Sequence, residues 1–219
     1  IQAVGVNDDR HERAGQYILH QIFHIGSVSQ SRSQHHHVSP FHLSFYHLPE
    51  FIPALHELVR GVGGYDGLRQ AFLENLTVFR ALCSNSKKGL LVVWGHGRPN
   101  EAVRRLVGIL DGALSGDAPL LAWSDIDLGG FGIVESLMSV SNRVRPVMMG
   151  EEDLRSVDAS RLLRRKEEYW ADMRRFVAHH PDSRFRDVAQ ACLELRGTLE
   201  QEALLFEYAQ EKIRGLFGA

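Results

Sequence analysis

Short apolar runs that alternate with helical patterns are the feature that most constrains the fold of this chain. Residues 89–95 (GLLVVWG) and 119–124 (PLLAWS) are typical of fully buried strands. Between them, residues 101–114 place apolar side chains on one helical face, and Asn100 can cap that helix. Residues 144–149 (VRPVMM) indicate a further strand. Strands that alternate with helices predict an α/β fold with a parallel sheet flanked by helices.

The remaining segments of this region are less distinct. Residues 68–73 fit a strand or a short helix that ends at Glu74, and residues 76–82 and 131–138 carry helical patterns. We expect the strands that end at Trp94, Trp123 and Met148 to be neighbours in one parallel sheet, joined by right-handed crossovers.

Acidic residues follow two of these segments. Asp125 and Asp127 close the run at 119–124, and strand alternation projects them together. The glycines after Leu128 allow a close backbone approach. Ligands of open parallel sheets gather beyond the carboxyl ends of the strands, where Glu74 is also expected. Three such carboxylates would suit Mg²⁺ or Mn²⁺. A solvated turn for the aspartates and a helix cap at Glu74 are the alternatives.

Composition divides the chain into three predicted parts. Residues 1–60 are rich in histidine and indicate a poorly ordered or non-native region, although a metal-binding histidine tract is an alternative. Residues 61–150 form the α/β core. Residues 151–219 form a C-terminal helical extension, with helical patterns at 160–177, 184–195 and 199–216. Because the chain opens on Ile1, we expect a fragment or a processed piece.

The bulk charge of the chain limits its partners. A formal net charge of -2 gives no global attraction to nucleic acid. Cys83 and Cys192 are far apart in sequence, which favours a reducing cytoplasm over a disulfide or metal framework. No apolar run approaches the roughly 18 residues of a membrane span, so no membrane association is expected.

The order of the segments supplies a resemblance. A glutamate at one strand end, a glycine-rich turn at the next (residues 95–99, GHGRP) and an Asp-x-Asp at the third resemble the Toprim domain of topoisomerases, primases and related nucleases. Residues 74–79 (ENLTVF), 91–97 (LVVWGHG) and 123–131 (WSDIDLGGF) are similar to JetD, the nuclease subunit of the Wadjet anti-plasmid SMC-like systems and a relative of the topoisomerase VI A subunit. Residues 145–149 and 197–202 also match, and the likeness covers roughly residues 67–209.

The resemblance implies a function and a site. It implies an endonuclease that uses Mg²⁺ or Mn²⁺ to hydrolyse plasmid DNA together with SMC-like subunits. Glu74 would be a general base or metal ligand, and Asp125 and Asp127 would hold the metal. Mutual repulsion implies that replacing Glu74 or Asp127 leaves the melting temperature unchanged or higher. The sequence does not give the oligomeric state, and a homodimer stays open.

Two other functions are compatible with the same residues. The chain could be a catalytically silent Toprim piece that docks on SMC-like partners. It could also be another metal-dependent phosphoryl-transfer enzyme, although Glu74 stands where a nucleophilic aspartate would be needed.

Several further residues are secondary candidates, each with a solvated surface as its alternative. His96 and Arg98 could touch phosphate, and Glu135 could be an additional metal ligand. Glu200 and Glu202 could approach the site from the extension. The basic residues of 161–166 (RLLRRK), with Arg174 and Arg175, could face DNA.

Overall fold

A parallel sheet forms the centre of the computed structural model, which describes residues 2–3, 69–85, 90–95, 97–114, 118–205, 212 and 215. Four parallel strands lie in the order β3-β2-β4-β5, and the two-residue β1 (Gln2–Ala3) adds antiparallel to β3. The parallel strands are β2 (Arg69–Leu73), β3 (Leu90–Trp94), β4 (Leu120–Trp123) and β5 (Val144–Pro146). The predicted α/β fold is confirmed, and this sheet is consistent with a Toprim-like fold.

The strand order differs from the prediction in one respect. β2 lies between β3 and β4, so the strands that end at Trp94 and Trp123 are not direct neighbours. The polar start of β2 obscured a central strand, since Gln70 is only 1% exposed in the structure. Leu73 pairs with both Trp94 and Trp123, so the carboxyl ends of three strands are level.

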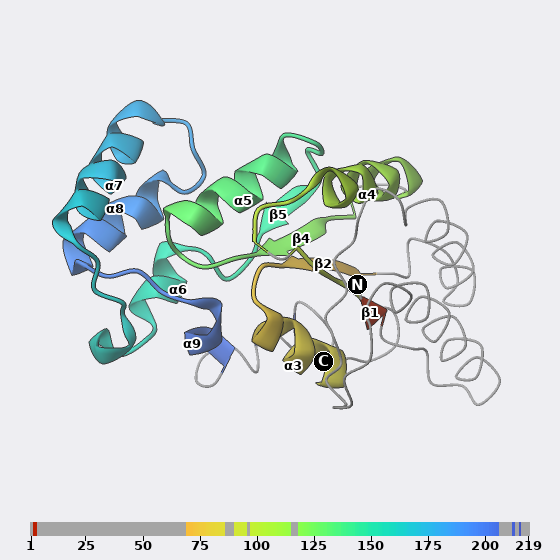
Figure 1. Ribbon diagram of the computed structural model, residues 1–219, viewed down its shortest axis with the longest axis horizontal. Coiled ribbons are helices and arrows are strands. Elements are labelled where there is room, and N and C mark those ends of the chain that lie inside the picture. The colour runs from red at the N-terminus through yellow and green to blue at the C-terminus, as the bar shows by residue number, and fades with distance from the viewer. Residues whose placement is uncertain are drawn as a thin grey trace, which may run out of the picture.

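Helices cover both faces of the sheet. Figure 1 shows α4 (Glu101–Ala113) and α5 (Leu128–Met138) on one face and α3 (Leu76–Asn85) on the other. Asn100 caps α4 as predicted, because its side chain accepts the N–H of Val103. The buried face of α4 also follows the predicted spacing, and it comprises Ala102, Val103, Leu106, Val107 and Leu110.

Some element boundaries were predicted wrongly. β5 ends at Pro146 rather than Met149, and Met148 has a positive φ of 55° that no strand continues through. The helix expected over residues 160–177 is broken, because Leu163 pairs with Thr198 in an isolated bridge. Only the turn Ala159–Arg161 and α7 (Glu167–His179) are helical there.

The C-terminal elements pack on the sheet through the same core. α6 (Glu151–Arg155) and α7 contact α8 (Arg186–Leu195), while α9 (Gln201–Leu205) contacts α3. Phe131 of α5 stacks on Phe185 with ring centroids 4.8 Å apart. One cluster of buried side chains runs from Ala71 to Leu204. The core therefore crosses residue 150, where the extension was predicted to begin.

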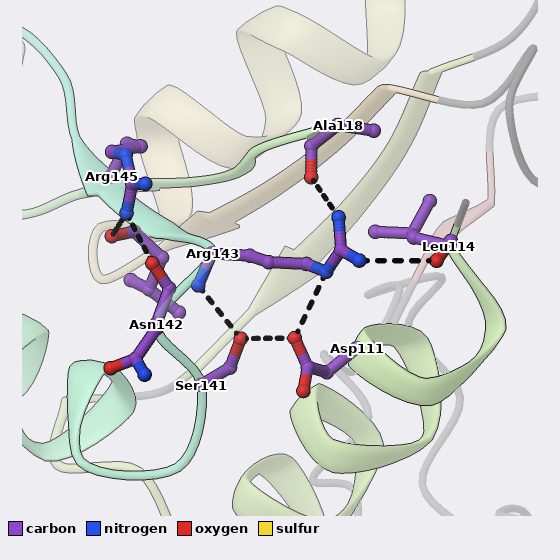
Figure 2. Close-up of polar contacts among 8 residues, drawn as sticks. Asp111, Leu114, Ala118, Ser141, Asn142, Arg143 and Arg145 are labelled. Atoms are coloured by element: carbon purple, nitrogen blue, oxygen red, sulfur yellow. Dashed lines mark hydrogen bonds and ion pairs between the residues drawn. The ribbon is translucent and has the colours of Figure 1, made fainter. Parts of the chain in front are cut away.

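The amino ends of the strands are fixed by a polar network (Figure 2). Arg143 pairs with Asp111 at 3.2 Å and donates to the carbonyl oxygens of Leu114 and Ala118. It thereby ties the end of α4 to the start of β4. A polar pocket of ≈ 780 Å³ opens beside this network, with Ser141 and Arg145 in its lining.

Two further points concern membrane-spanning helices and the histidine-rich region. In the described part of the chain, no helix is long and apolar enough to cross a membrane. The histidine-rich region predicted over residues 1–60 lies outside the described residues apart from β1, as does His96.

Candidate functional site

Glu74 lies where three strand ends meet. It directly follows β2, and its N–H donates to the carbonyl oxygen of Trp123 at 3.3 Å. The indole N–H of Trp94 donates to the carbonyl oxygen of Glu74 at 2.8 Å. These two contacts fix the backbone of Glu74 between the ends of β3 and β4. The position at a strand end that the sequence predicted is therefore the one observed.

The Glu74 carboxylate contacts the segment that carries the aspartates. Its Oε2 accepts the N–H of Asp125 at 3.3 Å. Burial, followed by the nearby charge of Asp125, raises the pKa of Glu74 to about 7. The charges of Asp127 and Glu200 act in the same direction, and the hydrogen bond from Asp125 only partly offsets them.

Asp125 is held by the C-terminal region. Its Oδ1 accepts the backbone N–H of Gln201 at 2.8 Å. Burial raises the pKa of Asp125 to about 6, although the Gln201 hydrogen bond opposes this shift. The charges of Asp127 and Glu200 also raise this pKa, whereas Arg165 lowers it. Glu74 and Asp125 therefore share a crowded negative environment.

Asp127 has a different environment, because both of its carboxylate oxygens have partners. Oδ1 accepts the N–H of Gly130 at 2.8 Å and caps α5. Oδ2 pairs with Arg165 at 3.1 Å, and the Asp127 side chain is 18% exposed. The helical pattern predicted a start at Phe131, three residues after the observed start at Leu128, because this pattern carries no sign that Asp127 caps the helix.

Gly130 explains why glycines follow the Asp-x-Asp. A Cβ at this position would lie 2.1 Å from the carbonyl oxygen of Asp125. The close approach that the sequence predicted thus occurs within the chain, where it brings the start of α5 against the turn at Asp125.

Two residues of the site were missed in the sequence. Gln201 contacts Asp125, and Arg165 contacts Asp127. Arg165 also donates to Thr198 Oγ1 at 3.0 Å and lies over the Tyr169 ring. Arg165 was interpreted as part of the basic run at residues 161–166. Nothing in the local sequence distinguishes it from the other basic residues of that run. For Gln201 the only signal was the likeness of residues 197–202 to the family.

The secondary candidates are placed differently by the structure. Glu200 is exposed, but its charge acts on both Glu74 and Asp125. Glu202 and Glu135 are not among the main causes of either pKa shift, and Glu135 accepts the Ser183 hydroxyl at 2.7 Å. Arg98 is exposed.

Four of the basic residues expected to face DNA, including Arg165, have partners within the chain. Arg164 donates to the carbonyl oxygens of Leu195 and Arg196. Arg174 pairs with Glu167, and Arg175 pairs with Asp172. These contacts weaken the interpretation of the basic run as a DNA-facing patch.

The oxygen atoms of the three carboxylates are suitable ligands for a hard cation, but the side chains are not arranged as a complete metal site. Carboxylate oxygens are the ligands that Mg²⁺ prefers, and a cation would relieve the repulsion between Glu74 and Asp125. Within the residues that the structure describes, no three histidine, cysteine, aspartate or glutamate side chains form a group that could hold a metal ion as they stand. Asp127 would have to exchange Arg165 for the ion.

A comparison with protein families assigns the chain. The family model described as "Wadjet protein JetD, C-terminal" matches residues 68–213. The chain belongs to the JetD family. Membership in this family indicates a component of a Wadjet system. The match begins at the start of β2 and includes Glu74, Asp125, Asp127 and Gln201. No curated protein matches the chain.

Proposed function

We propose that this JetD-family chain is the metal-dependent DNA endonuclease subunit of its Wadjet system, working in the cytoplasm with SMC-like subunits. The observation that carries the proposal is the contact between the Glu74 carboxylate and Asp125 at level strand ends. Both residues lie inside the family match. Neighbouring carboxylates with raised pKa values are typical of functional sites.

Each acidic residue has a proposed role. Asp125 and Asp127 would hold Mg²⁺ or Mn²⁺, and Glu74 would be a further ligand or the general base. A bound divalent ion would neutralise phosphate charge and lower the pKa of a water molecule. A bound cation would lower the pKa of Glu74 below its metal-free value of about 7, so that Glu74 would be charged near neutral pH and able to bind the ion or to accept a proton.

DNA would be delivered by partners. Phosphate neutralisation supplies most non-specific DNA affinity, and the net charge of -2 provides little of it. Arginines 164, 165, 174 and 175 are engaged in internal contacts. We therefore expect weak or no cutting by the isolated chain and efficient cutting in the complete complex.

Plasmid cleavage by the complete complex tests this proposal. Supercoiled plasmid should be linearised with Mg²⁺ or Mn²⁺, and Glu74→Ala or Asp127→Ala should abolish cutting. Glu202→Ala is the matched control, since this glutamate is close in sequence to Glu200 but is not among the main causes of the pKa shifts of Glu74 and Asp125. Cutting that persists in the Glu74→Ala complex would exclude the catalytic assignment.

A catalytically silent docking module is the second candidate. Arg165 favours it, because the ion pair with Asp127 occupies one of the proposed ligand oxygens. Calorimetry with Mn²⁺ separates the two candidates. The nuclease proposal requires binding that the double substitution Asp125→Ala and Asp127→Ala abolishes, whereas a docking module would bind no ion at this place.

A further inference from the structure

Gln201 is a buried amide residue beside the carboxylates. It is 1% exposed and is the first residue of α9. Its side-chain amide donates to the carbonyl oxygen of Trp123 at 2.8 Å and accepts the backbone N–H of Asn75 at 2.8 Å. Its backbone N–H donates to Asp125 Oδ1 at 2.8 Å. One residue therefore contacts the ends of two strands and the carboxylate between them.

The three bonds have a geometric consequence. The side chain joins Trp123, the last residue of β4, to Asn75, the residue after Glu74. This double attachment fixes the place of the Gln201 backbone and so the direction of the N–H that Asp125 accepts. Glu74 lies between these anchors, with its own N–H on the same Trp123 carbonyl.

We propose that Gln201 is a positioning residue, which sets the relative placement of Asp125 and Glu74 for the ion that the proposed function requires. The effect on ion binding rests on the proposed function, but the effect of Gln201 on the placement of Asp125 does not depend on it. The C-terminal region would then contribute to the site itself as well as to the core. Residues that orient metal ligands from outside typically change metal affinity by about 10–100-fold when replaced.

A purely structural role is the competing explanation. Any buried amide group needs hydrogen-bond partners, and Gln201 could serve only to satisfy the Asn75 N–H and the Trp123 carbonyl. In that case its replacement would lower the stability of the whole core while the Asp125 contact persisted. The two explanations therefore differ in what happens to the amide of residue 201.

Amide hydrogen exchange in metal-free protein measures the geometric part. Gln201→Met keeps the length of the side chain and the backbone N–H but removes both amide contacts. We expect the amide of residue 201 to exchange at least about tenfold faster than in the wild type, approaching its rate in Asp125→Ala. Core amides such as that of Val92 should exchange only as much faster as the change in the free energy of unfolding requires. Gln190→Met is the matched control, since Gln190 is exposed on α8.

Mn²⁺ affinity in the same variants measures the functional part. Gln201→Met should weaken Mn²⁺ binding by about tenfold or more, and Gln190→Met should leave it unchanged. Gln201→Asn is the second variant, because it keeps an uncharged amide group but is one methylene shorter, so it should not reach Asn75 and Trp123 together. It should give a smaller loss than Gln201→Met, and it places no new charge beside Asp125.

The outcomes separate the two proposals. If residue 201 keeps its slow exchange in Gln201→Met, or if the folded variant binds Mn²⁺ as the wild type does, the positioning role is wrong. If wild-type protein binds no Mn²⁺, the proposed metal-dependent function fails, and the exchange rates alone decide whether Gln201 positions Asp125.

Discussion

At the scale of single residues, Glu74 and Asp127 show how differently two acidic residues at strand ends can be treated. Glu74 is partly buried beside another carboxylate and accepts one weak hydrogen bond from Asp125. Asp127 has a helix N-terminus on one oxygen and an arginine on the other. Replacing them should therefore have opposite effects on stability.

Glu74→Gln should stabilise the metal-free protein at high pH only. The folded-state pKa of about 7 lies above the ordinary glutamate pKa of 4.5, so the folded state binds this proton more tightly than the unfolded state. The contribution of Glu74 to the free energy of unfolding of the wild type is therefore lost as the pH rises from the unfolded-state pKa through the folded-state pKa. In the presence of a chelator, the variant should match the wild type at pH 4, below the unfolded-state pKa. At pH 8 it should melt higher by about 2–4 °C, after allowance for solvent screening.

Asp127→Ala is the contrasting variant in the same thermal melts. Loss of the α5 cap should destabilise the protein by about 1 kcal/mol, and Asp127→Asn should retain most of the capping contribution. This reverses, for Asp127, the expectation from mutual repulsion alone. A Glu74→Gln protein that is no more stable than the wild type at pH 8 would contradict the assigned pKa.

The positions of the acidic residues were predictable, but their partners were not. Glu74, Asp125 and Asp127 were found because they directly follow apolar segments, and strand ends place them together. Gln201 and Arg165 lie 76 and 38 positions from the aspartates that they contact. No local spacing marks a glutamine or an arginine whose partner is so distant in the chain.

At the scale of elements, the start of α5 depends on one glycine. The Asp127 side chain caps the helix by accepting the N–H of Gly130. The Cα of Gly130 lies so close to the backbone of Asp125 that a Cβ would not fit there. The sequence predicted the helix but placed its start at Phe131, because apolar periodicity begins later than the capped turn does. Boundaries of this kind follow from backbone contacts rather than from the apolar pattern.

Gly130→Ala and Gly132→Ala form a matched pair within α5. A methyl group at Gly130 would overlap the carbonyl oxygen of Asp125, which is backbone and cannot rotate away, so we expect a loss of about 1–3 kcal/mol or more. A methyl group at Gly132 meets nothing within 4 Å and should add up to about 1 kcal/mol by helix propensity. Urea denaturation measures both, and equal effects would contradict the close approach.

At the scale of the whole molecule, the sheet and the C-terminal helices share one core. Ile126 pairs with Leu199, Phe131 stacks on Phe185, and the Leu128 N–H donates to the Tyr169 hydroxyl at 2.9 Å. The fold class was predictable from alternating strand and helix patterns. The place of β2 and these long-range contacts were not, because they depend on which surfaces the folded elements bury together.

The sheet and the C-terminal helices should therefore unfold together. In native-state hydrogen exchange, the slowest amides of β4 and of α8 should open with the same free energy and the same dependence on denaturant. Leu121 and Ala122 represent the sheet, and Ala191 and Cys192 represent the helices. Helical amides that open at low denaturant while β4 stays protected would show two separate units.

The contact between Gln201 and Asp125 also has a consequence for biosynthesis. A ribosome adds about 5–20 residues per second, so the 76 positions between them take about 4–15 s to make. During nearly all of that interval the nascent chain contains β2, β3, β4 and all three proposed ligands but lacks the segment that holds Asp125. If Gln201 positions Asp125 as proposed, the carboxylates take their final arrangement only after the segment around residue 201 has been made and has packed against them.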